Sequence, residues 1–311
     1  MIQEECVNPI AVVLAVSALV LGLPAGKAQA AVPGRPSPAP FVSTTWLAAH
    51  AGTPGLVVVD LRSAADYDAG HLPNSVSIPF AVPLSAWIVS RDDLLLELPP
   101  FADLSAALGR AGITKRSKVV LVTGVSTPPQ AQAGGTRAAV TLMYAGLTDV
   151  SILDGGHPKW VADGRATTTA VPAVTPVTFD GTAGGVSFVD IDYVRAAVGR
   201  TTIVDARDAD VYSGKVVEPY ANKAGHIPSA VSLPTVSFFN ADGGYRTTRE
   251  LRVAVEGVVG TDKNKEVIVY CGVGGYASTT TFVMTKLLGY RNVKFYDGSA
   301  QEWVRNFSME L

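Results

Sequence analysis

The 311-residue sequence contains few of the residues that cross-link a chain or bind a metal ion. Its two cysteines are Cys6 and Cys271, and its four histidines, at positions 50, 71, 157 and 226, lack the spacing of metal ligands. We therefore expect no metal site, and no motif in the sequence requires a cofactor.

Charge is also scarce, and neither sign dominates. Charged residues make up 17% of the chain, and 25 basic against 27 acidic residues give a net charge of −2. A balance of this kind excludes the strongly basic surface of nucleic-acid-binding proteins. With 48% hydrophobic residues, the composition is typical of a chain with many buried strands, and the length is enough for two domains.

No apolar run is long enough for a comfortable membrane span, but one near the N-terminus is typical of an export signal. The chain is almost wholly apolar from Ile10 to Leu23 and then reaches Ala28-Gln29-Ala30, a cleavage motif. Glu4 and Glu5 stand where such signals usually carry lysine or arginine, so retention as an anchor is the alternative. We predict a signal peptide over residues 1–30, a Pro-rich linker over 31–40, and an exported protein of the periplasm or cell envelope with no membrane span in the mature chain.

Cleavage after Ala30 removes Cys6 and leaves Cys271 as the only thiol. A single cysteine cannot form an internal disulfide, so Cys271 is not there to cross-link the chain. The alternative to a functional role is a buried cysteine that acts as a small hydrophobic residue. The residues around Cys271 decide between the two.

The chain contains one pattern twice. Residues 57–80 and 202–235 both carry Val-Asp-x-Arg, a tyrosine and Gly-His-[Leu/Ile]-Pro, and the second copy is about ten residues longer between its tyrosine and its histidine. Trp160 recurs as Trp303 and Gly146 as Gly289, so the repeat extends over a whole domain. Thr123 of the first copy stands where the second has Cys271.

Each copy alternates short apolar strands with helices, which predicts an α/β fold with a parallel sheet in each of two tandem domains. We place domain 1 at residues 41–165, a linker at 166–187 and domain 2 at 188–311. The predicted strands of domain 1 cover 56–61, 75–80, 118–123 and 150–156, and its helices 103–112 and 136–146. Domain 2 repeats them as strands at 202–207, 230–235, 266–271 and 293–299, and helices at 249–258 and 278–290.

The residues around Cys271 favour a nucleophile. Cys271 ends a predicted strand and is followed by a glycine-rich turn and a helix predicted to start near Ser278. Ligands of parallel sheets bind at this edge, where glycines let several N–H groups face inward and the helix N-terminus adds positive charge. Such a site stabilises a thiolate, or a persulfide attached to it. We call residues 271–277 the Cys271 loop; after Cys271 its members are Gly272, Val273, Gly274, Gly275, Tyr276 and Ala277.

These features together resemble the rhodanese family of sulfurtransferases in its two-domain form. The resemblance covers residues 42–307 and rests on the repeated Asp-x-Arg and Gly-His-[Leu/Ile]-Pro motifs, the Cys271 loop, the helix at 98–113 and the matching segments 153–160 and 296–303. It implies that sulfane sulfur passes from a donor such as thiosulfate or 3-mercaptopyruvate, through a persulfide on Cys271, to a thiophilic acceptor such as cyanide or a thiol. It also implies that domain 1 is inactive, as Thr123 and the longer turn with Pro128 and Pro129 suggest, because proline supplies no N–H group.

The sequence leaves the two donors nearly balanced, with thiosulfate slightly favoured. Thiosulfate-specific members tend to carry basic residues after the cysteine, whereas Gly272–Gly274 is neutral and closer to the mercaptopyruvate branch. That branch places arginines before Gly-His-Ile-Pro, where this chain has Tyr220 and the lysines Lys215 and Lys223.

Other polar residues near the repeats receive weaker predictions. Arg246 and Arg249 are the nearest anion-binding candidates, with a solvated helix start as the alternative. Asp205, Arg207 and His226 have counterparts in domain 1, which favours a structural role.

Two further classes of function share this scaffold. A phosphatase or arsenate reductase needs Cys-x5-Arg, and position 277 is alanine, which argues against that chemistry. A non-catalytic persulfide carrier or redox-sensing module that serves a thiol-containing partner protein stays open.

Overall fold

The computed structural model describes residue 1 and residues 38–311. The predicted signal peptide and all but the last three residues of the predicted Pro-rich linker lie outside the described residues. Those last residues run beside the strand β7 (Val150–Leu153), where the carbonyls of Ala39 and Pro40 accept hydrogen bonds from Ser151 Oγ and the Ile152 N–H at 2.7 and 2.9 Å. Among the described residues, no helix has the length and apolar character needed to cross a bilayer.

Domain 1 is built on a parallel sheet of five strands in the order β1-β7-β6-β2-β3. A two-stranded antiparallel hairpin, β4–β5, is inserted after β3. The elements in chain order are β1 (Phe41–Val42), α1 (Thr44–His50), β2 (Leu56–Asp60), α2 (Ala64–Ala69), β3 (Ser75–Ser77), β4 (Val89–Arg91), β5 (Leu94–Glu97), α3 (Phe101–Arg110), β6 (Lys118–Val122), α4 (Gln130–Tyr144), β7 and α5 (Gly156–Ala162).

Domain 2 repeats this sheet strand for strand. Read from the matching edge, its order is β8-β12-β11-β9-β10, and all of its pairs are parallel. Its elements are β8 (Ser187–Val189), α6 (Ile191–Ala197), β9 (Thr202–Asp205), α7 (Ala209–Tyr212), β10 (Val231–Ser232), the 3-10 turn η1 (Thr235–Phe238), α8 (Thr248–Val259), β11 (Val267–Tyr270), α9 (Gly275–Phe282), the π-helical turn η2 (Val283–Leu287), β12 (Val293–Tyr296) and α10 (Ser299–Asn306). The predicted fold class of two tandem parallel α/β domains is confirmed.

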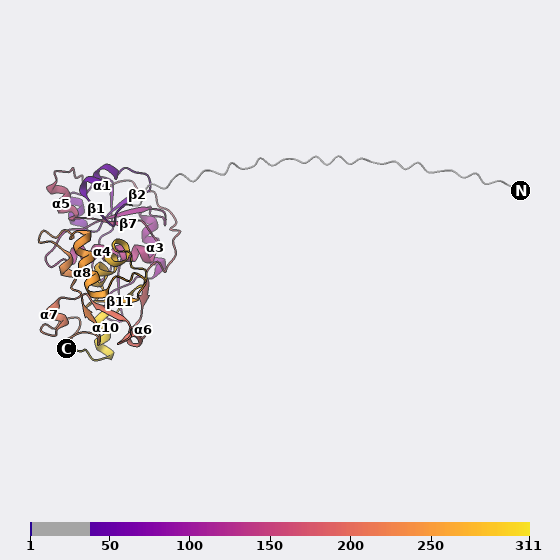
Figure 1. The fold of residues 1–311 in the computed structure, drawn as a ribbon. Coiled ribbons are helices and arrows are strands. Elements are labelled where there is room, and N and C mark those ends of the chain that lie inside the picture. Colours follow the sequence, from indigo (N-terminus) through magenta and orange to yellow (C-terminus); the bar gives the residue numbers. More distant parts are fainter. Residues whose placement is uncertain (2–37) are drawn as a thin grey trace. The chain divides into compact units, whose positions relative to one another are not determined.

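The two sheets enclose one shared core. Alternate residues of β11, Val267 and Val269, face the same apolar cluster as Val119 and Leu121 of β6. The helices α3, α4, α8 and α9 contribute to this cluster from both domains, so they form a layer between the sheets (Figure 1). The outer faces of the sheets have smaller clusters of their own, under α1 and α5 in domain 1 and under α6 and α10 in domain 2.

The helices α4 and α9 pack against each other more extensively than any other pair of described elements. At their crossing, Thr136 Oγ1 lies 2.8 Å from Thr279 Oγ1 and 3.0 Å from Ser278 Oγ. Thr136 and Thr279 precede the matching Gly146 and Gly289 by the same number of residues, so equivalent residues of the two copies touch. The domains are therefore related by a local two-fold axis that passes close to this threonine pair.

Both of these helices begin earlier than the sequence predicted. α9 begins at Gly275 instead of Ser278, and α4 at Gln130 instead of residue 136. Glycine disfavours helix in isolation, but here close packing requires it. A Cβ atom on Gly135 would lie 2.5 Å from Thr123 Cγ2. The turns after the central strands are therefore residues 124–129 in domain 1 and 272–274 in domain 2.

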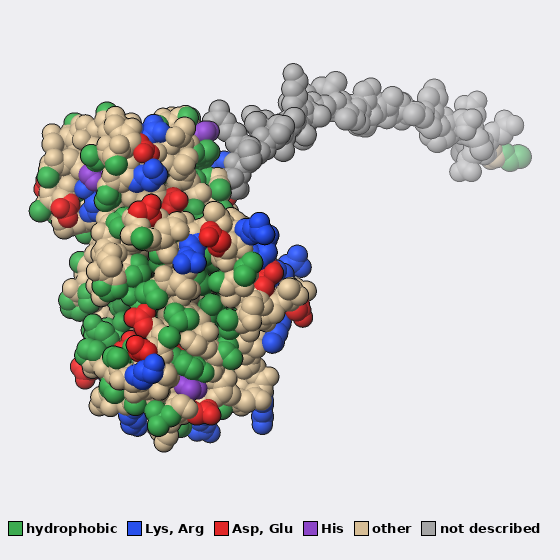
Figure 2. All heavy atoms as spheres, turned by 60° about the vertical axis from the view of Figure 1, so that its left-hand side comes forward, with side chains coloured by type: hydrophobic (Ala, Val, Ile, Leu, Met, Phe, Trp, Pro, Cys, Tyr) green, Lys and Arg blue, Asp and Glu red, His purple; other side chains and the backbone are tan. Residues whose placement is uncertain are grey.

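The segment between α5 and β8 joins the domains with little regular structure. Thr168 pairs with His71 in an isolated β-bridge, and the N–H groups of Val177 and Gly184 donate to the carbonyls of Gly109 and Tyr144. On the face seen in Figure 2, acidic and basic side chains are interspersed, which agrees with the nearly balanced charge of the sequence.

Candidate active site

Cys271 lies at the carboxyl end of β11, which is paired with β9 and β12 on either side. Its side chain is only 3% exposed. The turn from Gly272 to Gly274 follows, and Gly274 adopts a left-handed conformation (φ +87°) directly before the first residue of α9. This conformation, which favours glycine, turns the chain sharply enough to bring the start of α9 over the thiol.

Backbone N–H groups converge on the sulfur atom. The Gly274 N–H donates to Cys271 Sγ at 3.1 Å, and the N–H groups of Val273 and Ala277 also act on the thiol in the direction that lowers its pKa. The structure thus contains the cradle of donors that the glycine-rich sequence predicted. Donors in this arrangement can stabilise negative charge on the sulfur or on an atom attached to it.

Burial has a larger effect on the thiol than these donors. It raises the pKa of Cys271, the three N–H groups lower it, and the carboxylate of Glu218 raises it further, so the net direction is upward. The sequence predicted a stabilised thiolate from the N–H donors alone. It did not show how deeply Cys271 is buried, and burial raises the pKa of the thiol. Burial and the loop N–H groups therefore act on the pKa of this thiol in opposite directions.

Residues 297–301 form hydrogen bonds with the backbone of the Cys271 loop. Ser299 Oγ accepts a hydrogen bond from the Cys271 N–H at 3.3 Å, and the N–H groups of Ala300 and Gln301 donate to the carbonyls of Cys271 and Gly272 at 2.9 and 3.0 Å. These contacts fix the backbone from which the cradle is made. They give a structural reason for the closing motif at 296–303, to which sequence reasoning assigned no role.

Glu218 is a neighbour of the Cys271 loop that sequence reasoning missed. A Cβ atom on Gly272 would lie 2.8 and 2.9 Å from the two carboxylate oxygens of Glu218, so the carboxylate rests directly on the loop. Glu218 Oε2 also lies 3.3 Å from Arg207 Nη1. Burial raises the pKa of Glu218, and Arg207 opposes that shift. In the sequence, the only indication that a residue such as Glu218 lies beside the loop was the extra length of the second copy before His226.

Residues of domain 1 contact the Cys271 loop and the neighbouring Asp297, and the sequence did not indicate them. Arg137 of α4, which is fully buried, pairs with Asp297 at 2.6 Å. Its Nη1 lies 3.3 Å from where a Cβ on Gly274 would be. The Leu98 N–H donates to the other oxygen of Asp297 at 2.7 Å, and Leu96 packs against Gly275. Both domains therefore build the surroundings of the Cys271 loop.

Asp205, Arg207 and His226 have the partners of structural residues. Arg207 binds Asp205 through Nε and Nη2, at 2.6 Å for the shortest contact, and also donates to the Gly225 carbonyl. His226 stacks on Tyr212 with 3.9 Å between ring centroids and contacts the Tyr212 carbonyl through Nδ1. Domain 1 has the same arrangements around Asp60, Arg62 and His71.

Arg246 and Arg249 lie together at the start of α8. They line a surface hollow at the start of α8, together with residues of that helix alone and the preceding turn. Arg246 Nε donates to the Phe239 carbonyl. Their role in binding anions stays a prediction.

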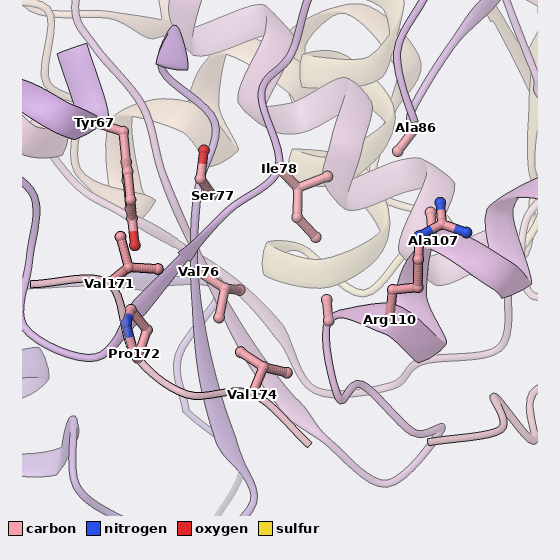
Figure 3. Close-up of a pocket in the computed structure, with 11 residues that line it drawn as sticks. Tyr67, Val76, Ser77, Ile78, Ala86, Ala107, Arg110, Val171, Pro172 and Val174 are labelled. Atoms are coloured by element: carbon pink, nitrogen blue, oxygen red, sulfur yellow. The ribbon is translucent and has the colours of Figure 1, made fainter. Parts of the chain in front are cut away.

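A second hollow, of about 350 Å³, lies in domain 1 and the adjoining linker (Figure 3). Its walls are mostly apolar, from Val76 and Ile78 beside β3 to Val171 and Val174 of the linker, with Arg110 at its edge. Its lining contains no cysteine and no residue of the Cys271 loop. In the described residues, no group of three or more His, Cys, Asp or Glu side chains is placed to hold a metal ion.

Comparison with known proteins identifies the family. The model of the rhodanese-like domain matches residues 43–163 and again 190–306. The chain is 33% identical to a putative thiosulfate sulfurtransferase of Saccharopolyspora erythraea over 274 residues, which cover 85% of this chain and 92% of that protein. It is 36% identical to the putative thiosulfate sulfurtransferase SseA of Mycobacterium leprae, with 86% and 88% covered. It is also 31% identical to the sulfur carrier protein TtuD of Thermus thermophilus, with 87% and 95% covered.

Solved structures share the fold. The 3-mercaptopyruvate sulfotransferase SseA of Escherichia coli superposes with a TM-score of 0.69 at 26% identity, over 84% of this chain and 99% of that one. EanB, solved as a persulfide with ergothioneine, gives a TM-score of 0.72 at 23% identity over 88% of this chain and 71% of that one, a likeness of fold alone. With a match to both of its domains and relatives that align over nearly their full length, the chain belongs to the rhodanese family.

Proposed function

We propose that this protein transfers sulfane sulfur through a persulfide on Cys271. The observation that carries the proposal is a single cysteine at the end of a central strand, with backbone N–H groups directed at its sulfur atom. Thiosulfate and 3-mercaptopyruvate are the donors to consider, since relatives carry names of both kinds.

In the first half of the reaction, Cys271 loses its proton and Sγ attacks the outer sulfur of the donor. An S–S bond forms at Cys271, the bond between that sulfur and the rest of the donor breaks, and the leaving group departs with the electron pair as sulfite or pyruvate enolate. In the second half, the acceptor attacks the outer sulfur and the Cys271 thiolate leaves. The N–H groups of the Cys271 loop stabilise the negative charge that develops at the sulfur in both halves.

Mass spectrometry of the intact protein tests this proposal. Incubation with thiosulfate or 3-mercaptopyruvate should add the mass of one sulfur atom, and cyanide should then remove it and form thiocyanate. Cys271→Ser should lose both effects. Full thiocyanate formation by Cys271→Ser would rule out the assignment of the nucleophile.

A second candidate is a persulfide carrier or redox-sensing module that serves a partner protein with a thiol. The likeness to TtuD, a sulfur carrier protein, favours it. A carrier would take up sulfur on Cys271 but turn over slowly with cyanide and small thiols. Comparison of uptake with turnover in the wild-type protein therefore separates the two candidates.

We also propose that the protein is exported to the periplasm or cell envelope. The apolar stretch from Ile10 to Leu23 and the Ala28-Gln29-Ala30 motif support this proposal. The mass of the protein recovered from the cell envelope should correspond to a chain that begins at Ala31, and a full-length mass would contradict cleavage.

A further inference from the structure

Domain 2 differs from domain 1 by a longer segment that passes beside the Cys271 loop. Tyr67 and His71 are 4 residues apart, whereas the equivalent Tyr212 and His226 are 14 residues apart. Glu218 belongs to this longer segment, and its carboxylate lies against Gly272 with a side chain that is 20% exposed. Val216, Val217 and Tyr220 are each about half exposed. The segment therefore offers apolar contacts and one carboxylate to a compound that approaches Cys271.

One cation opposes this carboxylate, and it is shared. Arg207 contacts Glu218 through Nη1, but its Nε and Nη2 bind Asp205 in a fully buried pair. Asp208 adds a further negative charge close by, because it raises the pKa of both Glu218 and Tyr276 of the loop.

Two other basic groups of this region have partners away from the Cys271 loop, since Lys215 pairs with Asp210 and Lys223 donates to the Phe307 carbonyl. Arg137 lies against Gly274 of the loop, but its charge is balanced by Asp297 at 2.6 Å. The surroundings of the sulfur therefore carry an excess of negative charge, and a dianion is repelled about twice as strongly as a monoanion.

We propose that Glu218 determines the charge class of the sulfur compounds that react at Cys271. Neutral and cationic donors and acceptors, such as the persulfide or thiol form of an aminothiol, are accepted in preference to dianions such as thiosulfate. Among anionic donors, the singly charged 3-mercaptopyruvate is preferred to thiosulfate, which reverses the slight preference suggested by the sequence. That the selected compounds are sulfur donors and acceptors rests on the proposed sulfur transfer. The selection by charge does not, because it applies to any reagent that reacts with Cys271.

Charged thiol reagents measure this selection without any sulfur chemistry. The cationic 2-aminoethyl and the anionic 2-sulfonatoethyl methanethiosulfonates both form a mixed disulfide with Cys271 and release methanesulfinate, so intact mass gives the rate for each. The wild-type protein should react faster with the cation. A charge about 6 Å away, at an effective dielectric constant of about 40, changes a rate by about tenfold per unit of reagent charge. Glu218→Gln should therefore reduce the cation-to-anion rate ratio by tenfold or more.

Two further variants separate charge from structure. Glu218→Asp keeps the negative charge and should keep a ratio within about threefold of wild type. Glu256→Gln removes the same charge from α8, where Glu256 pairs with Lys263 at 2.7 Å, and should leave the ratio unchanged. A ratio that is the same in Glu218→Gln as in wild type would overturn the proposal.

The wild-type protein alone gives a second test, which does not depend on whether a variant folds. Added salt should slow the cationic reagent and speed the anionic one, because screening weakens the field of Glu218. The opposite trend, or none, would contradict the proposal. If the ratio depends on Glu218 but no donor yields a persulfide, charge selection stands and the sulfurtransferase function fails.

Discussion

The two domains share a sheet and differ in the turn that leaves its central strand. After β6, Thr123 is followed by six residues that include Pro128 and Pro129 before α4 begins. After β11, Cys271 is followed by three residues, and the N–H groups of Val273, Gly274 and, in α9, Ala277 act on the sulfur. The sheet, the Asp-Arg ion pairs and the histidine stacks are therefore common to both domains, and the length and N–H content of this turn distinguish them.

The space above that turn also differs between the domains. Domain 1 has a hollow of about 440 Å³ over Thr123, lined by Arg62 and His157 among others. In domain 2 the equivalent arginine, Arg207, contacts Glu218, which rests on the Cys271 loop. The longer segment of domain 2 thus places the Glu218 carboxylate above the turn, where domain 1 has an open hollow.

The largest effect should come from the contact through which domain 1 supports the site. Arg137→Leu leaves the carboxylate of Asp297 without its cation in a buried place, and loss of one partner of a buried ion pair costs about 3–5 kcal/mol. Urea denaturation should show this loss of unfolding free energy. Arg110→Leu, at an exposed arginine on α3, should change it by less than about 0.5 kcal/mol. Equal losses in the two variants would mean that the interface does not depend on this pair.

An effect that grows as the pH rises concerns the same interface. Burial, together with the nearby Asp297, raises the pKa of Glu97 from 4.5 to about 8 despite the opposing effect of Arg137. The folded state therefore holds a proton that the unfolded chain releases at lower pH, and this contribution to stability is full below about pH 4.5 and lost as the pH rises to about 8.

Glu97→Gln should remove that decline. Its free energy of unfolding should exceed that of wild type by about 5 kcal/mol at pH 9 and be similar to it at pH 4.5. Urea denaturation at the two pH values measures the difference. Parallel pH profiles for the two proteins would show that Glu97 keeps an ordinary pKa.

The smallest effect is expected when the nucleophile is moved to domain 1. Thr123→Cys in a Cys271→Ser background should give no persulfide with either donor, because the turn at 124–129 contains two prolines and is twice as long as its counterpart. Intact mass measures the sulfur uptake. Addition of one sulfur atom at residue 123 would show that the scaffold suffices and that the turn is not what inactivates domain 1.

The sequence could predict the fold and the nucleophile because both leave local patterns. Alternating burial along β11, with Val269 on one face and Tyr270 on the other, follows from short apolar runs, and the glycines after Cys271 indicate a turn. The starts of α4 and α9 could not be predicted, because glycine propensity argues against helix where tertiary packing demands small residues.

The charge around Cys271 was equally out of reach of sequence reasoning. The insertion that carries Glu218 is visible as extra length, but its path across the sheet edge is set by contacts with Arg207 and Gly272 that are distant in sequence. Depth of burial is also a property of the whole fold, and it decides the direction in which the pKa of Cys271 moves.

The contact between Thr136 and Thr279 has a consequence for how such a protein can change. Equivalent residues that touch across a two-fold axis are the signature of an isologous interface, the kind that joins two identical subunits. In a homodimer every substitution occurs in both subunits at once. Covalent fusion removes that constraint, so Arg137 can reach across to Asp297 while the residue at the matching place in α9, Thr280, bonds within its own half to Thr235. One half is then free to specialise as a support for the other.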